Sequence, residues 1–331
     1  MLFYKTERSN VNTQNEKEED VMIKKSRQGG SPMFLIIGII FLLISIGLGV
    51  CLVIQQCEYD RQVDAVVDIK DLVVSTLPSE SNDTAPPETN VMGGSEQIPE
   101  ETEPDRIYID ANFLRVFDFE QLQAINTDAS RWVYIPDTPI DAYVLQEQTV
   151  GEYYYLYKDI YREYSSIGSF LTPKIPMDAD DAHLLIFGHT FSANKDLAFG
   201  SLKIHYADAA IAEMHPYVYV YYPDRVERWQ VWAACDAHAY DAVYDLPYAI
   251  GSGEYADMIS DMEVKSRYQL CDKPDRWTQT LFLSTCNGRR GGSNVRLVIA
   301  CVPDIVYYYD TKSVESFGHE TIGSVGGIHG N

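Results

Sequence analysis

The chain has 331 residues, of which 46% are hydrophobic and 23% are charged. Its 26 basic and 49 acidic residues give a net charge of −23, which excludes a nucleic-acid partner, because that kind of binding depends on basic surfaces. The six cysteines include no Cys-x-x-Cys pair, so neither a zinc site nor a redox motif is indicated, and we expect no metal and no cofactor.

The first distinct segment is an apolar run at residues 33–54, preceded by a polar, mixed-charge tail at residues 1–32. The run contains no charged residue, and at about 1.5 Å per residue a helix of this length spans the roughly 30 Å hydrocarbon core of a membrane. A cleaved signal peptide is the alternative, but the polar region before the run is long and no small-x-small cleavage site follows. We therefore predict one transmembrane helix.

Charges on either side of this run predict its orientation. Lys24, Lys25 and Arg27 precede it, whereas Glu58 and Asp60 follow it. Because basic residues favour the cytoplasmic side, we expect a single-pass protein of the cell membrane, with a cytoplasmic N-terminus and the folded domain outside the cell.

Residues 55–105 are predicted to be an extracellular tether. A short amphipathic helix is possible at about 57–74, and residues 75–105 are acidic and rich in Pro, Ser and Thr. A segment of this composition buries too little apolar surface to fold, so it behaves as a flexible linker. Beyond it we predict a folded domain at residues 106–310 and a Gly-rich tail at residues 311–331.

Most of the folded region has the pattern of short strands. A helix is predicted over residues 117–125, and further helical pieces near 208–214 and 254–264. Strands are predicted at residues 132–135, 140–145, 153–157, 183–187, 217–222, 228–235, 280–286 and 296–302. About eight short strands with few long helices predict a mainly β fold, a small closed or nearly closed β-barrel.

Cys286 is the strongest candidate for a nucleophile. It ends the apolar run at 280–286, follows the hydroxyls of Ser284 and Thr285, and has three arginines within the next ten positions. An electropositive setting favours the thiolate, which is the reactive form of cysteine. The alternative interpretation is an inert strand cysteine, because cysteine is among the most buried residue types.

Two further residues could complete a reactive group. His189 leaves the apolar run at 183–187 at a strand-to-loop exit, the same kind of position as that of Cys286. Arg296 begins the next strand, and a hairpin-like pairing would place its guanidinium beside the thiol. The alternatives are a structural histidine and a solvated surface arginine.

Together these segments resemble the sortase family of membrane-anchored cysteine transpeptidases. The Phe-Gly-His-Thr run at 187–190 matches the family's histidine motif, and residues 281–286 and 296–299 match its cysteine and arginine strands. The segment at 129–146 resembles the family's opening strand pair. Residues 153–156, 164–170 and 199–202, and the helix-bearing insert after Cys235, are similar to class B sortases in particular.

This resemblance implies an eight-stranded sortase β-barrel and a two-step acyl transfer. Cys286 would attack a threonine carbonyl in the C-terminal sorting motif of a secreted protein, and an amine of a peptidoglycan precursor, or alternatively of a pilin lysine, would resolve the thioester. His189 would move the protons and Arg296 would stabilise the oxyanion. Residues around the nucleophile would bind substrate: Ser284, Thr285 and Asn287.

The sequence also departs from the family pattern. Asn287 stands where many class B members have an acidic residue, so no carboxylate assistance is expected there. Cys235 and Cys301 lie on apolar strands and are expected in the core, with a disulfide as the alternative, while the family does not account for Cys271. An inactive sortase-fold binding module and a plain cysteine peptidase are the other functional hypotheses.

Overall fold

The computed structural model describes residues 32–76, 111–146, 153–173, 182–190, 198–245, 247–286, 294–310 and 313–316. The chain divides into two compact units, Met1–Arg61 and Gln62–Asn331, and each is described by itself. The predicted tail at 1–32, apart from Pro32, and the predicted substrate-binding residue Asn287 lie outside the described residues.

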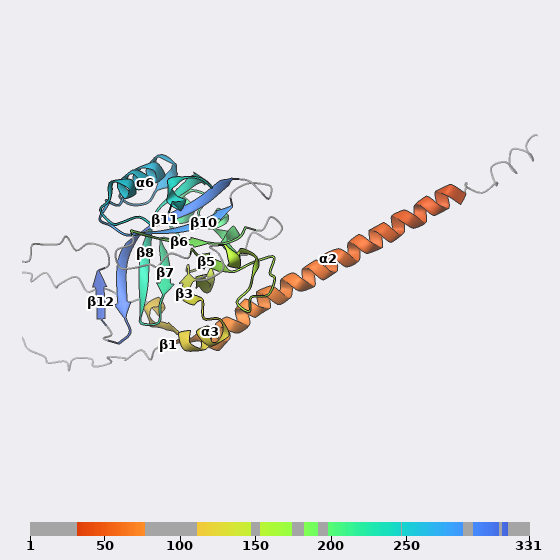
Figure 1. Ribbon diagram of the computed structural model, residues 1–331, viewed down its shortest axis with the longest axis horizontal. Helices are drawn as coiled ribbons and strands as arrows, with labels where there is room; N and C mark the ends of the chain where they lie inside the picture. The colour runs from red at the N-terminus through yellow and green to blue at the C-terminus, as the bar shows by residue number, and fades with distance from the viewer. Residues whose placement is uncertain are drawn as a thin grey trace, which may run out of the picture. The chain divides into compact units, whose positions relative to one another are not determined.

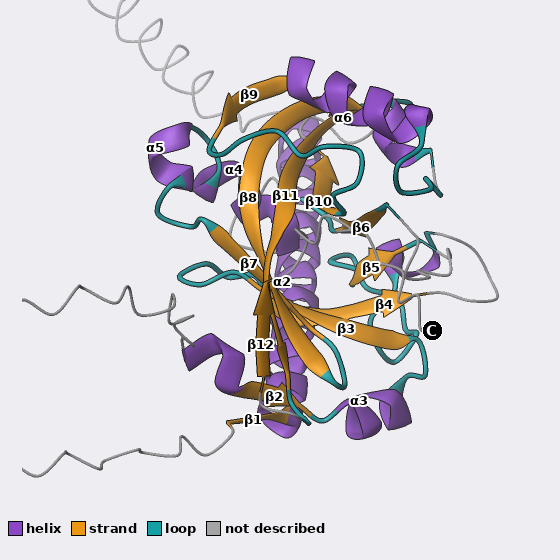
Figure 2. Cartoon of the chain, turned by 90° about the vertical axis from the view of Figure 1, so that its left-hand side faces the viewer, coloured by secondary structure: helices purple, strands orange, loops and turns teal. Residues whose placement is uncertain are grey.

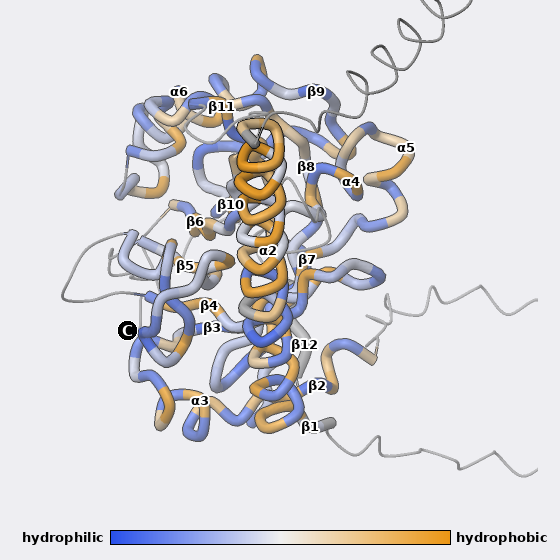
Figure 3. The backbone as a smooth tube through the Cα atoms, turned by 90° about the vertical axis from the view of Figure 1, so that its right-hand side faces the viewer, coloured by the Kyte–Doolittle hydropathy of each residue, from blue (hydrophilic) through white to orange (hydrophobic). Residues whose placement is uncertain are grey.

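The first unit consists of the greater part of helix α2 (Pro32–Val73). The large apolar side chains from Met33 to Ile54 are exposed, and Figure 3 shows the corresponding apolar colouring along this helix. Among the described residues, α2 is the one helix that is long and apolar enough to cross a membrane. It contains the apolar segment that the sequence predicts as a span.

The second unit is built around a ten-stranded sheet, shown in Figures 1 and 2. Its strands are β3 (Ala129–Tyr134), β4 (Asp141–Gln146), β5 (Phe170–Thr172), β6 (His183–Phe187), β7 (Tyr217–Tyr221), β8 (Arg225–His238), β9 (Ser266–Gln269), β10 (Thr280–Cys286), β11 (Val295–Tyr308) and β12 (Ser313–Ser316). The order is β12-β11-β10-β6-β5-β4-β3-β7-β8-β9, and β8 also pairs with β11. That pairing closes eight strands into the predicted barrel and leaves β9 and β12 outside it.

Short helices and a small two-stranded sheet surround the barrel. The α-helices are α3 (Phe119–Ile125), α4 (Leu202–His205), α5 (Ala209–Ala212) and α6 (Gly253–Val264). The 3₁₀ turns are η1 (Ala111–Leu114), η2 (Tyr154–Tyr157), η3 (Ala198–Ser201) and η4 (Ala242–Tyr244), and β1 (Val74–Thr76) pairs with β2 (Arg115–Phe117). Asp118 caps α3 by accepting from the Gln121 amide, and Ser252 caps α6 by accepting from the Tyr255 amide.

Side-chain alternation along β10 shows where the core sits. Leu281 and Leu283 point into the barrel core, whereas Phe282 belongs to a second cluster beneath α6, with Met258 and Trp232. Both faces of the central strands are therefore buried, which explains their nearly continuous apolar sequence. Each fully buried side chain of this size contributes roughly 1.5–3 kcal/mol to folding, so the strands that end at the candidate site are firmly held.

The strand predicted at 153–157 is wrong, because these residues form the 3₁₀ turn η2. In a strand, Tyr153, Tyr155 and Tyr157 would share one face, yet Tyr155 is buried while Tyr153 and Tyr157 are exposed. The backbone instead closes on itself, with the Leu156 amide donating to the Tyr153 carbonyl at 3.1 Å.

Helix α2 continues well past the end of the predicted membrane segment. Its last turns belong to the second unit, where Ile69 and Val73 pack in a core cluster with Phe113 and Trp132. The sequence assigns these residues to the tether, with a short amphipathic helix possible at about 57–74. Ile69 and Val73 lie at i and i+4, which places them on one face of a helix.

A charged cluster holds this end of α2 to the barrel. The Asp141 carboxylate on β4 pairs with Lys70 of α2 and accepts two hydrogen bonds from Arg115 at 3.0 and 3.1 Å. It also accepts from the Trp132 indole at 2.7 Å. One largely buried carboxylate therefore ties together α2, β2, β3 and β4.

At the other end of the domain, β12 lies within the predicted Gly-rich tail and extends the sheet beside β11. Cys235, Cys271 and Cys301 are all free, and Cys235 and Cys301 are fully buried. Cys235 and Cys301 are therefore core residues, as the simpler of the two sequence interpretations predicts.

Candidate active site

The barrel topology brings the three predicted catalytic residues to one rim. Strands β6 and β10 are parallel neighbours, with Phe187 opposite Ser284. His189 and Cys286 each lie two residues beyond this pair, where the two strands end. Strand β11 runs antiparallel to β10, and Arg296 is the direct partner of Cys286.

A hydroxyl pair fastens the His189 loop to the end of the Cys286 strand. The Thr285 hydroxyl donates to the Gly188 carbonyl at 2.8 Å, and its oxygen lies 2.6 Å from that of Thr190. Thr190 in turn donates to the Cys286 carbonyl at 3.0 Å. The residues on both sides of His189 are thus tied to Thr285 and Cys286.

Gly188 allows the close packing behind this loop. A Cβ atom at this position would lie 2.7 Å from the Phe199 ring and 2.9 Å from the Phe170 ring, closer than side chains tolerate. The two rings stack on each other with centroids 4.2 Å apart. The glycine before His189 is therefore required by packing against β5 and η3.

His189 sits against η2. Its ring lies 5.0 Å from the Tyr157 ring, and it hydrogen-bonds the backbone carbonyl of Leu156. Burial lowers the pKa of the imidazole below its usual value, although the Leu156 carbonyl acts in the opposite direction. A lowered pKa keeps His189 neutral near pH 7, which is the form that can accept a proton.

Cys286 and Arg296 lie at the open edge of the site. The Cys286 side chain is exposed and that of Arg296 is half-buried. A guanidinium so placed provides a permanent positive charge with several donors beside the thiol. The arrangement can stabilise the oxyanion that forms when the thiol attacks a carbonyl.

Ser284 and Thr285 are present at the site but are almost completely buried, at 1% and 2% exposure. The Ser284 hydroxyl lies 2.9 Å from the Tyr244 hydroxyl on η4. Burial raises the pKa of Tyr244, and the charges of Arg296 and Cys286 also act on it. Sequence reasoning missed Tyr244, because nothing in its own segment indicates that the insert after β8 returns to β10.

Among the described residues, no cluster of three or more His, Cys, Asp or Glu side chains is placed to hold a metal ion. The side chains that the structure brings to this rim are a thiol, an imidazole, a guanidinium and several hydroxyls.

Comparisons with known proteins place the fold. No family model and no curated protein matches the sequence. The Staphylococcus aureus sortase B–substrate complex matches with a TM-score of 0.50 and 20% identity, over 56% of this chain and 83% of that chain. Clostridium perfringens sortase B matches with a TM-score of 0.49 and 21% identity, over 56% and 98% of the two chains.

Sortase B from B. anthracis is also similar, with a TM-score of 0.47 and 22% identity, over 56% of this chain and 83% of that chain. At these identities the likeness concerns the fold alone. The closed eight-stranded barrel, its strand order and the Staphylococcus aureus match lead to one conclusion. The second unit of this chain has the sortase fold, as its sequence motifs predict.

Proposed function

We propose that the protein is a sortase-type cysteine transpeptidase in which Cys286 carries the acyl group. The observation that carries this proposal is the direct pairing of Cys286 with Arg296 at the rim where the His189 strand ends. A nucleophile that attacks a carbonyl needs a base for its proton and a group that stabilises the oxyanion, and His189 and Arg296 could fill these two roles.

In the first step His189, neutral because its pKa is lowered, accepts the Cys286 thiol proton. The sulfur attacks a threonine carbonyl of the sorting motif, and Arg296 stabilises the oxyanion that forms. The C–N bond then breaks, and His189 returns the proton to the leaving amine. A thioester on Cys286 remains, and the peptide after the threonine departs.

In the second step an incoming amine attacks the thioester and loses a proton to His189. The C–S bond breaks, the new amide is released, and His189 returns the proton to the Cys286 sulfur. The acceptor we propose is a cell-wall peptide amine of a peptidoglycan precursor. A pilin lysine is the alternative acceptor, and a class B pilus-polymerising role follows from it.

Helix α2 supports our proposal that the reaction takes place at the membrane. Its apolar segment is long enough to span a bilayer, and basic residues precede it, so we propose a single pass with the barrel outside the cell. Confinement of enzyme, sorting substrate and wall precursor to one surface would raise their effective concentrations. The secreted partners would be proteins that carry a C-terminal sorting signal.

The direct test uses the full chain in detergent, with a library of sorting peptides and either glycine-type or lysine-type amine acceptors. We expect ligation products that depend on added amine and are lost in Cys286→Ala. Cleavage at a rate unaffected by amine would instead indicate a plain cysteine peptidase. Binding of sorting peptides without turnover would indicate an inactive binding module.

A further inference from the structure

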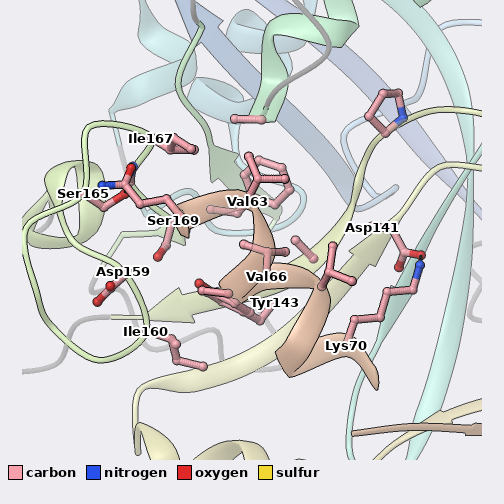
Figure 4. Close-up of a pocket in the computed structure, with 18 of the residues that line it drawn as sticks. Val63, Val66, Lys70, Asp141, Tyr143, Asp159, Ile160, Ser165, Ile167 and Ser169 are labelled. Carbon is pink, nitrogen blue, oxygen red and sulfur yellow. Dashed lines mark hydrogen bonds and ion pairs between the residues drawn. The ribbon is translucent and has the colours of Figure 1, made fainter. Parts of the chain in front are cut away.

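A cavity of about 380 Å³ separates the last turns of α2 from β4 and the segment that follows η2. All of its walls belong to the second unit, and they include none of the proposed catalytic residues. Figure 4 shows Val63 and Val66 of α2 facing Tyr143, Ile160 and Ile167 across the space. A mainly apolar cavity of this volume falls in the range of about 300–1,000 Å³ that is typical of small-molecule sites.

The two ends of this cavity differ in charge. At one end, Asp141 pairs with Lys70, which lines the cavity, and with Arg115, which lies behind the lining, so this cluster of two cations and one carboxylate carries one net positive charge. Figure 4 places Lys70 and Asp141 together at that end, with Asp159 and Ser165 at the other side. An anionic group is therefore attracted toward Lys70, and an apolar chain fits between the valines and isoleucines.

From this geometry we propose that the cavity binds the acyl chain of an anionic membrane phospholipid, with the headgroup beside Lys70. The inference rests on the membrane anchoring proposed above. Gln62, the first lining residue, follows Ile54 by only about two turns of helical sequence, so anchoring keeps the cavity within reach of membrane lipids. Lipid thus has both the required chemistry and a high local concentration.

The site would hold α2 in place as well as bind lipid. Gln62, at the start of the lining, accepts from the Ser165 hydroxyl at 3.1 Å, while Lys70 is fixed by Asp141. The segment of α2 that lines the cavity is thus held by hydrogen bonds or ion pairs at both ends, and the cavity between these contacts is lined by apolar side chains. A chain that fills such a gap restores the dispersion contacts that the lining side chains lack.

The test is photolabelling of the full chain in lipid nanodiscs, with phosphatidylglycerol that carries a diazirine at the end of its acyl chain. Mass spectrometry then maps the label. We expect label in β4 and in residues 159–170, besides the apolar segment of α2. Label in α2 alone would overturn the lipid site but leave the anchoring intact, whereas label in neither would contradict both.

Substitutions that fill the cavity provide a second test of the lipid site. Val63→Trp and Val66→Trp should each abolish label in β4 and in residues 159–170, whereas Leu72→Trp should not, because Leu72 is exposed on the same helix and outside the lining. Thermal unfolding of each variant confirms that it is folded. Undiminished label in both filled variants would overturn the proposal.

Competition between two lipids tests the placement of the headgroup beside Lys70. Phosphatidylglycerol should compete with the label about fivefold better than phosphatidylcholine of the same chain length, the factor expected for one favourable charge near a membrane surface. Lys70→Gln should remove this preference. Equal competition by the two lipids in the unmodified protein would contradict the placement of the headgroup beside Lys70.

Discussion

Cys286 and Arg296 face each other as direct partners on antiparallel strands β10 and β11. The pairs deeper in the barrel, such as Leu283 with Ile299, are apolar and fully buried. The thiol and the guanidinium therefore belong to the last residue pair between β10 and β11, at the rim of the barrel. Their proximity follows from strand register rather than from flexible loops, which favours a preorganised site.

Removal of the Arg296 side chain should slow acyl transfer without unfolding the protein. In Arg296→Ala, kcat/KM for sorting-peptide cleavage should fall by on the order of 10²–10³, as for the loss of one oxyanion donor. Arg276→Ala is the matched control, because Arg276 is exposed in another loop and packs over Trp277. Equal activities of the two variants would remove Arg296 from the mechanism.

Gly168→Ala should damage the site indirectly. Gly168 has a φ of 65°, and a Cβ atom there would lie 2.2 Å from the Leu156 carbonyl oxygen, the group that hydrogen-bonds His189. The backbone strain alone costs about 1–3 kcal/mol. We expect a lower unfolding midpoint and a lower kcat together.

The matched control for that substitution is Gly253→Ala, because no atom lies within 4 Å of the added Cβ at the start of α6. This variant should keep full activity and gain slightly in stability, since alanine is favoured over glycine within helices. Unchanged catalysis in Gly168→Ala would show that η2 does not position His189.

The hydroxyl of Thr285 should contribute both to the stability of the protein and to catalysis. Thr285→Val keeps the shape but removes the donor to the buried Gly188 carbonyl, which costs about 1–3 kcal/mol of the free energy of unfolding. It also releases the link to Thr190, so kcat should fall more than KM changes. Thr285→Ser retains the hydroxyl and should recover most of the activity. If serine fails to rescue, the methyl group rather than the hydrogen bond is what matters.

Burial of His183 should make the folded domain less stable in acid. This residue is 3% exposed among Tyr248, Tyr255 and Phe282, and burial lowers its pKa from 6.5 to about 4. Between these two values the unfolded chain binds more protons than the folded chain, so the free energy of unfolding rises with pH. About 3 kcal/mol should be lost as the pH falls from 6.5 to 4.

Denaturant titrations at several pH values measure this effect. His183→Phe should lack that share of the pH dependence, because phenylalanine fits among the same rings and does not titrate. His238→Phe, at an exposed position, should keep the slope of the unmodified protein. Parallel pH profiles for all three proteins would contradict a buried neutral His183.

The sequence predicts best the strands that are buried on both faces. The bounds predicted for His183–Phe187 and Thr280–Cys286 agree with β6 and β10, because long apolar runs end there at glycine or polar residues. Strand β5, which is three residues long, was not predicted, since such a segment has too few positions to show a period. Its place between β4 and β6 depends on long-range pairing.

At the site, local sequence identifies the residue types but not their supports. Cys286, His189 and Arg296 stand out at strand ends, and the structure places them at one rim. The contacts that hold them come from distant segments, such as Tyr244 with Ser284 and Thr190 with Thr285. Partners separated by tens of residues leave no periodic signal, so only the fold reveals them.

The most direct test of the central claim is the intact mass of the full chain after mixing with a sorting peptide in the absence of an amine acceptor. We predict a mass increase equal to the acyl fragment, located at Cys286, removed by hydroxylamine and missing in Cys286→Ala. Peptide cleavage with no adduct in the unmodified protein, or an unchanged adduct in Cys286→Ala, would contradict the acyl-transfer mechanism.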